Sequence, residues 1–249
     1  MSEANVLPPM SLVLVGMSGV GKSAAGNTIL GREEFISEAS PSSLTLTSKR
    51  GIGDVCGRRV TVVDTPGLCN TELSGEKLRE EMQRAVTLCD PKPHAVLLVI
   101  QLGRFTEQEK RVMETLQELF SNGVNEYTVV LFTYGDRLRN TTIEEFIRRD
   151  TNLLQLLRKC GNRYHVFNNE CMTNSDQVTG LLEKINMLLY NNITQNKGTL
   201  KMIISFVQRF AKPIIGGVLG AAVGGLAGGV IGAVIGLVVG CAVGEVWRR

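Results

Sequence analysis

The sequence predicts an α/β fold: a three-layer domain with a mainly parallel sheet and one antiparallel hairpin, followed by a hydrophobic membrane helix near the C-terminus. Three observations predict it. Apolar runs typical of buried strands alternate with amphipathic helical segments. A glycine-rich turn joins the first apolar run to the first helix, and 32 consecutive residues near the end carry no charged side chain. We therefore expect a loose arm at 1–10, the α/β domain at 11–192, a linker and amphipathic helix at 193–212, a membrane segment at 213–244 and a basic tail at 245–249.

Composition narrows the class of protein before any motif is considered. The chain has 249 residues and a formal charge of +3, which is too mild for a dedicated nucleic-acid surface. Its six cysteines form no C-x-x-C pair, and its two histidines are too few for a His-rich metal site. The N-terminus, through Pro8-Pro9, lacks an apolar signal region. These features predict a reduced, cytosolic domain.

The first half of the domain alternates strands and helices around a long polar loop. Leu12–Val15 is a continuous apolar run, as expected of a strand covered on both faces. Residues 31–50 are rich in Ser and Thr and show no period, which indicates a functional or mobile loop. The expected elements are a strand at Leu12–Val15, a helix at Lys22–Leu30, a hairpin with strands at Gly51–Cys56 and Arg59–Val63, and a helix at Gly75–Cys89.

The second half repeats the alternation, with capping signals at two helix starts. Thr106 and Glu109, and again Thr142 and Glu145, have the spacing of a capping box. The apolar pattern predicts that the second of these helices continues through Leu153–Leu157. The expected elements are strands at Ala95–Ile100, Tyr127–Thr133 and Tyr164–Phe167, and helices that begin at Thr106, Thr142 and Ser175, the last ending at Tyr190.

The turn after the first strand has the spacing G-x-x-x-x-G-K-S, from Gly16 to Ser23. A buried strand, a glycine-rich turn and a helix start are what a phosphate-binding loop requires, so the domain is predicted to be a P-loop NTPase. Lys22 is expected to reach the β and γ phosphates, and the Ser23 hydroxyl to bind Mg²⁺. The expected phosphate-binding residues are Gly16, Ser18, Gly19, Val20, Gly21, Lys22, Ser23 and Ala24.

A second phosphate-sensing motif, Asp64-Thr65-Pro66-Gly67, follows the hairpin. Asp64 stands at the carboxyl end of a predicted strand, about forty residues after Lys22, where an Asp holds Mg²⁺ through water. The N–H of Gly67 is expected to face the γ-phosphate. In such a protein the polar loop at 31–50 is the first switch.

A third motif, Thr133-Tyr134-Gly135-Asp136, predicts the base. One carboxylate can accept hydrogen bonds from both N1–H and the 2-amino group of guanine, a donor pair that adenine lacks. The usual pattern is Asn/Thr-Lys-x-Asp, so Tyr134 stands where a Lys stem normally covers the base. An aromatic ring can do this by stacking. Asp136, with Thr133 before it, is therefore the candidate guanine reader.

These motifs and their neighbours resemble the GTPases of immunity-associated proteins, the GIMAP or IAN family. The resemblance is specific in Asp90–Thr106, in Phe132–Asp136 and in Arg163–Asn169, and it covers about residues 11–192. It implies a septin-like G domain that binds GTP or GDP with Mg²⁺ and dimerises through its nucleotide face. It also implies that Ser23, Thr45 (or Thr47 in its place) and Asp64 form the metal site, and that Asn168 and Asn169 lie at the base.

No residue is assigned to catalysis. Leu68 follows Gly67, where Ras-like enzymes have the Gln that orients the attacking water, and an apolar side chain cannot do this. We therefore expect slow intrinsic GTP hydrolysis, with any missing group supplied by a second subunit. Arg104 and His94 are candidates near that interface. Alternatively, Arg104 is a solvated loop charge and His94 a structural residue at the start of a strand.

The stretch at 213–244 predicts contact with a lipid membrane. As one helix it is about 48 Å long, more than the roughly 30 Å of a hydrocarbon core. Glycine recurs at every fourth position from Gly216 to Gly244, a stripe that lets membrane helices approach closely. We favour a single C-terminal tail anchor over a re-entrant hairpin, whose arms of about fifteen residues are short. The domain is then expected on the cytoplasmic face of an intracellular membrane.

The sequence leaves more than one function open. The first is a membrane-anchored GTPase whose nucleotide state controls self-association, favoured by the intact Lys22, Ser23 and Asp64. The second is a GTP-binding scaffold with negligible hydrolysis, favoured by Leu68. A third makes a multimeric membrane assembly of the glycine stripe the primary activity. None of them involves nucleic acid.

Overall fold

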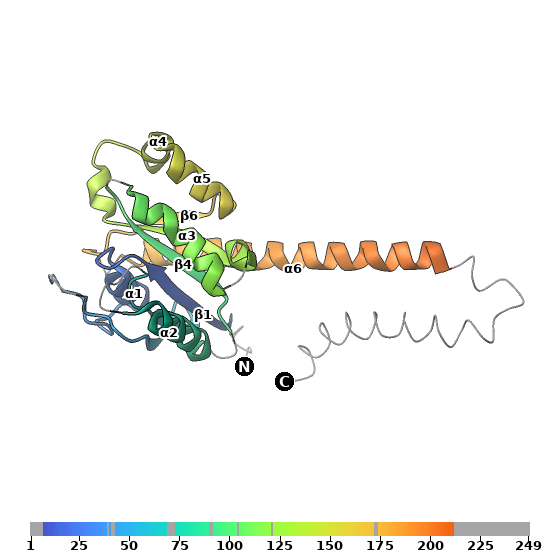
Figure 1. Cartoon of the computed structure of the whole chain (residues 1–249), viewed down its shortest axis with the longest axis horizontal. Coiled ribbons are helices and arrows are strands. Elements are labelled where there is room, and N and C mark those ends of the chain that lie inside the picture. Colours follow the sequence, from blue (N-terminus) through green and yellow to red (C-terminus); the bar gives the residue numbers. More distant parts are fainter. Residues whose placement is uncertain are drawn as a thin grey trace, which may run out of the picture. The chain divides into compact units, whose positions relative to one another are not determined.

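The structure is a computed structural model that describes residues 7–38, 40, 43–68, 73–89, 92–103, 105–120, 122–171 and 174–211. The chain divides into two compact units, with the boundary between Asn192 and Ile193. The first unit contains the sheet and the helices that cover it (Figure 1).

A single six-stranded sheet in the order β2-β3-β1-β4-β5-β6 forms the middle layer. The β2–β3 pair is antiparallel, and all other neighbouring strands are parallel. The expected mainly parallel sheet with one hairpin is therefore confirmed. The strands are β1 (Leu7–Gly16), β2 (Lys49–Val55), β3 (Arg58–Asp64), β4 (Ala95–Gln101), β5 (Thr128–Thr133) and β6 (Tyr164–Val166).

Strand β1 begins earlier than its apolar run indicates. It takes in residues 7–10, which we expected in the loose arm, because Leu7 pairs with Arg58 and Met10 with Val60 of β3. The register shifts between these two pairs, where Pro8 and Pro9 stand. Proline cannot donate to a strand ladder, so an irregularity at this point is expected of the strand.

The turn of the β2–β3 hairpin consists of Cys56 and Gly57, both with positive φ, 50° and 73°. Two residues with positive φ give the turn the twist that suits antiparallel strands. The hairpin brings the first residue of β2, Lys49, opposite Asp64 at the end of β3. The long loop before β2 is thereby brought next to the end of β3.

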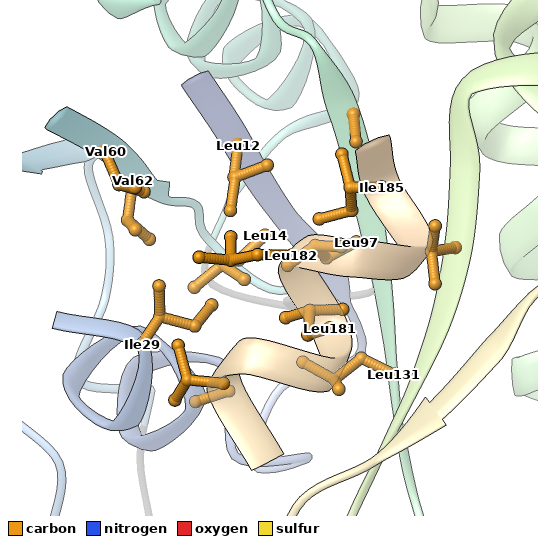
Figure 2. Packing of buried hydrophobic residues seen from close by; sticks show 14 of the residues in the cluster. Leu12, Leu14, Ile29, Val60, Val62, Leu97, Leu131, Leu181, Leu182 and Ile185 are labelled. Atoms are coloured by element: carbon orange, nitrogen blue, oxygen red, sulfur yellow. The ribbon is translucent and has the colours of Figure 1, made fainter. Parts of the chain in front are cut away.

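In the part of the chain that the structure describes, two α-helices cover one face of the sheet and four cover the other. On the first face, α1 (Lys22–Leu30) and the start of α6 (Ser175–Ala211) pack on alternate strand residues such as Leu12, Leu14 and Leu97 (Figure 2). The opposite core contains Val13, Val15 and Leu98. It is covered by α2 (Gly75–Leu88), α3 (Glu107–Phe120), α4 (Ile143–Arg148) and α5 (Thr151–Lys159).

The helices differ from expectation in two places. The helix expected to run from Thr142 through Leu157 is broken into α4 and α5, because Asp150 leaves the helical conformation and caps α5 by accepting from the N–H groups of Asn152 and Leu153. In α2, Met82 and Ala85 are buried, as the apolar face of an amphipathic helix should be, whereas the apolar side chain of Val86 is exposed. The capping box at Thr142 and Glu145 is present.

Helix α6 extends well past its predicted end at Tyr190. It is continuous to Ala211 and includes most of the segment expected to be a linker and an amphipathic helix. Among the described residues, no helix is long and apolar enough to cross a bilayer. The predicted membrane segment at 213–244 and the basic tail at 245–249 lie outside the described residues.

Candidate nucleotide-binding site

The glycine-rich loop forms the link between β1 and α1, as the spacing predicted. Gly21 directly precedes α1 with a φ of 87°, a conformation that residues with a Cβ rarely adopt. A Cβ on Gly21 would also lie 3.4 Å from the Asn169 amide nitrogen and 3.5 Å from the Thr133 methyl. The loop is therefore packed against residues from both base-reading segments, and its N–H groups stand at the positive end of the α1 dipole.

Lys22 is buried beneath this loop, with 6% of its surface exposed. Its Nζ donates to the carbonyl of Met17 at 2.7 Å, so the ammonium group is held against the backbone of the loop. Burial lowers the pKa of Lys22 to about 8, and the negative charge of Asp64 offsets only part of this. The site therefore holds a cation whose desolvation is incompletely compensated, and a phosphate placed in the loop would supply the missing negative charge.

Three predicted metal ligands converge at the start of α1. The hydroxyl of Ser23 donates to Asp64 Oδ2 at 2.7 Å, and that of Thr45 to the same oxygen at 3.3 Å. Burial raises the pKa of Asp64, while these hydrogen bonds and the charge of Lys22 oppose the rise. The second oxygen, Oδ1, is buried without a hydrogen-bond partner.

An orphaned carboxylate oxygen beside two hydroxyls is an incomplete ligand set of the kind that Mg²⁺ and its waters complete. Ser23, Thr45 and Asp64 therefore fit Mg²⁺ as the sequence predicted. The structure thus brings Thr45 to Asp64, so Thr47 is not needed as its substitute.

The segment after Asp64 lies against the phosphate loop. A Cβ on Gly67 would be 2.6 Å from the backbone nitrogen of Ser18, so no larger residue fits without displacing the loop. The N–H of Leu68 donates to the Gly16 carbonyl at 3.0 Å, and the Leu68 side chain is buried in the core beside α2. The side chain that follows Gly67 is therefore apolar and packed in the core, so it cannot orient an attacking water.

A pocket of about 260 Å³ opens beside α1 where a base would lie. Asp136, the predicted guanine reader, lines it together with Tyr134 and both predicted asparagines. Four further lining residues have polar side chains and were not predicted from the sequence. These residues are Asn27, Glu33, Ser37 and Glu170.

Tyr134 occupies a left-handed conformation, with φ 58°, at the start of the short 3-10 helix η2 (Gly135–Leu138) that carries Asp136. The guanidinium carbon of Arg137 lies 4.2 Å from the centre of its ring. Arg137 also donates to the Leu102 carbonyl at 3.1 Å, which ties this loop to the end of β4. The Tyr134 ring therefore makes a cation–π contact with Arg137, and it also lines the pocket.

The remaining predicted base-site residues are fixed from different sides. Asn169 accepts at Oδ1 from the Thr28 hydroxyl of α1 at 3.1 Å. The backbone N–H of Asn168 donates to Gln177 of α6 at 2.9 Å. Thr133 is fully buried, and its hydroxyl donates to the Val20 carbonyl at 2.7 Å, so it supports the phosphate loop from below.

Of the two candidate residues for a dimer interface, His94 and Arg104, the structure describes only His94. His94 precedes β4 at the amino end of the strand, opposite the phosphate loop, and its Nδ1 accepts from the Ser11 N–H at 3.0 Å. It is therefore the structural residue at a strand start that we gave as the alternative. Arg104 lies outside the described residues.

A glycine loop between a buried strand and a helix, an acidic metal ligand at a neighbouring strand end and an Asp-lined base pocket define a P-loop NTPase of the G-domain class. The family model described as the AIG1 family matches residues 10–203. The chain belongs to this family, and the resemblance to GIMAP and IAN proteins is thereby confirmed.

Its relatives include proteins from animals and plants. The chain is 37% identical over 190 residues to GTPase IMAP family member 8 of Mus musculus, a match to 73% of the chain and 28% of the relative. It is 38% identical over 166 residues to immune-associated nucleotide-binding protein 7 of Arabidopsis thaliana, a match to 64% of the chain and 53% of the relative. The chain thus spans a quarter to a half of the length of these relatives.

Among solved structures, Toc33 of Arabidopsis thaliana in complex with GDP and Mg²⁺ has a TM-score of 0.58, with 17% identity, over 74% of this chain and 86% of that one. A dimerization-deficient mutant of Toc33 gives the same TM-score at 18% identity, over 74% of this chain and 85% of that one. At these identities the likeness shows the G-domain fold.

Proposed function

We propose that this chain binds GTP and GDP with Mg²⁺ and hydrolyses GTP slowly. The proposal rests on one observation above all: Ser23 and Thr45 both point to Asp64, whose other buried oxygen has no partner, directly beside the phosphate loop. Mg²⁺ held there would neutralise charge on the β and γ phosphates. Lys22 would contact the same phosphates, and Asp136 would read guanine.

Relatives support this assignment. The mouse relative is named a GTPase, and the Arabidopsis relatives are named nucleotide-binding proteins. Toc33 has been crystallised with GDP and Mg²⁺ and with GMPPNP and Mg²⁺. These ligands match the chemistry of the residues in this chain, which supports a guanine nucleotide over other phosphorylated ligands.

The proposed slow rate is supported by the buried, apolar side chain of Leu68. A leucine side chain cannot orient water, so we propose that a second subunit completes the site across the nucleotide face. Dimerization is described as important for the GTPase activity of chloroplast translocon components related in fold. In the alternative, which Leu68 favours, the chain is a GTP-binding scaffold with negligible GTP hydrolysis that assembles on a membrane.

We further propose that residues 213–244 insert into a membrane as a single tail anchor, which leaves the G domain on the cytoplasmic face of an intracellular membrane. The absence of charge and the glycine stripe support this. Nucleotide state would then control self-association on that surface.

The nucleotide assignment is tested by calorimetric titration of the full chain, purified in mild detergent, with GDP, GMPPNP and ADP in the presence of Mg²⁺. We expect both guanine nucleotides to bind and ADP to bind far more weakly. The Asp64→Asn variant should lose Mg²⁺ dependence. If the wild-type chain ignores GDP and GMPPNP at millimolar concentration, the assignment is wrong. Phosphate release under multiple turnover then separates the GTPase from the scaffold.

A further inference from the structure

A buried carboxylate that takes no part in the proposed nucleotide site joins α2 to the first-switch loop. Glu81 of α2 is only 3% exposed, and its Oε2 accepts from the backbone N–H of Ser48 at 2.6 Å. The Ser48 hydroxyl, itself on a residue that is 1% exposed, donates to the Glu81 carbonyl at 3.0 Å. Two hydrogen bonds, both donated by Ser48 and accepted by Glu81, thus form a clasp, Ser48–Glu81, between segments 33 residues apart.

The position of the clasp relates it to the metal site. Ser48 lies three residues after Thr45, the loop residue that donates to Asp64. It also directly precedes β2, whose first residue pairs with Asp64. Thr45 is therefore held between its own contact with Asp64 and an anchor at Ser48. Because Glu81 belongs to the helix that follows Asp64 and Gly67, the anchor connects the first-switch loop to the helix after the second phosphate-sensing motif.

We propose that Glu81 is a positioning residue: through Ser48 it holds Thr45 at the metal site and thereby strengthens the binding of GTP relative to GDP. This rests on the proposed nucleotide function. Switch segments are ordered by contacts with the γ-phosphate and Mg²⁺, and they are released when that phosphate is lost. A residue that keeps Thr45 in place therefore favours the triphosphate state more than the diphosphate state.

The chemistry of the clasp explains why an acid or an amide is needed at this position. The Ser48 N–H is buried, so removal of its acceptor leaves a donor without a partner, which is costly. In a variant without the acceptor, the end of the loop would relieve that cost by moving into solvent, and Thr45 would move with it. Met82 and Ala85, which seat α2 on the core, are untouched by such a change.

The test measures the affinities of the full chain in detergent for GMPPNP and for GDP, both with Mg²⁺. Glu81→Met replaces the acceptor with an apolar side chain of similar length. We expect it to weaken GMPPNP about tenfold more than GDP, the loss of one buried hydrogen bond to a charged acceptor. Glu81→Gln is the matched control, because its amide oxygen still accepts from Ser48, and it should retain the wild-type ratio.

Two further variants separate positioning from general damage. In a Thr45→Val background, Glu81→Met should have no additional effect on the GMPPNP-to-GDP ratio, since the group it positions is gone. Ser48→Ala removes only the hydroxyl, so it should shift the GMPPNP-to-GDP affinity ratio in the same direction but by less. This variant provides the test if Glu81→Met does not fold.

An unchanged ratio in the Met variant, or a Gln variant that behaves like Met, overturns the proposal. So does an additive effect in the Thr45→Val background. A wild-type chain that binds neither nucleotide instead contradicts the nucleotide function itself, so the two failures are distinguishable.

Discussion

Two buried groups of opposite charge, Lys22 and Asp64, determine what the phosphate end of the site can accept. Burial lowers the pKa of the lysine and raises that of the aspartate, so each is held in a medium that disfavours its charge. Structural ion pairs are seldom left with an orphaned oxygen such as Asp64 Oδ1. A polyphosphate and a divalent cation would complete such an arrangement, and this argues for a ligand rather than for stability.

Tyr134 gives a direct test of the base pocket. We predict that Tyr134→Asn weakens GDP binding about tenfold, the loss expected when one aromatic ring no longer stacks on a base. Asn tolerates the positive φ of this position, so the change removes the ring without adding backbone strain. Tyr134→Phe keeps the ring and its contact with Arg137, and it should bind as the wild type does. Calorimetry that finds equal affinities for all three proteins would show that the ring does not touch the base.

His94 gives the chain a pH dependence away from the nucleotide. Its Nδ1 accepts from the Ser11 N–H, so the ring must be neutral there, and burial together with Arg58 and Lys92 lowers its pKa below the usual 6.5. When the pKa of a group is lower in the folded state than in the unfolded state, the unfolded state binds protons more readily. The group's contribution to the stability of the fold is then present above its unfolded-state pKa and is lost as the pH falls. We therefore predict that the urea midpoint of the full chain falls as the pH drops from 7 toward 5.

The control for this prediction is His94→Asn, whose amide oxygen can accept from Ser11 and does not titrate. The variant should show a shallower fall in urea midpoint over the same pH range. His165 also has a lowered pKa, but its Nε2 lies 2.7 Å from the Gln177 carbonyl, which a protonated ring satisfies. Identical pH profiles for wild type and variant would contradict the role given to His94.

The break between α4 and α5 depends on one side chain. Asp150 accepts from two backbone N–H groups at the start of α5, at 2.8 and 3.0 Å. We predict that Asp150→Ala lowers the free energy of unfolding by about 1 kcal/mol, the usual cost of losing such a cap. Asp150→Ser, which can still cap, should lose much less. Urea unfolding of the three proteins checks this, and an Ala variant as stable as wild type would mean that the cap contributes nothing.

The same region shows where sequence reasoning reached its limit. The strands, the hairpin and the phosphate loop follow from consecutive residues, so their patterns are local and were predicted. The Asp150 cap was missed because the apolar period of Leu153–Leu157 continues that of α4. The base pocket was half predicted: Asp136 follows a strand, and the resemblance to the GIMAP and IAN family implied the two asparagines. Glu33, Ser37 and Glu170 reach it only through the folding of the loops that carry them, which no local pattern records.

Self-association is a property of more than one chain, and its test is kinetic. If a second subunit completes the site that Leu68 leaves open, GTP hydrolysis per molecule should rise with protein concentration under single-turnover conditions. The measurement follows phosphate release while the full chain is diluted in constant detergent, with the protein always in excess over GTP. A rate per molecule that stays flat over a wide range of concentration would remove the dimer mechanism and favour hydrolysis within one chain or none.

The proposed membrane insertion of residues 213–244 rests on the sequence alone, so its test must be independent of the G domain. We predict that the full chain floats with neutral phospholipid vesicles. Val230→Arg places a charge near the middle of the uncharged stretch, at a cost of about 3 kcal/mol if that position lies at the bilayer centre. It should therefore reduce flotation sharply, while Val230→Leu leaves it unchanged. GDP affinity, measured on all three proteins, should not differ, because the nucleotide site is built entirely from the first unit. Equal flotation of the Arg and Leu variants would mean that this stretch is not the part of the chain that enters lipid.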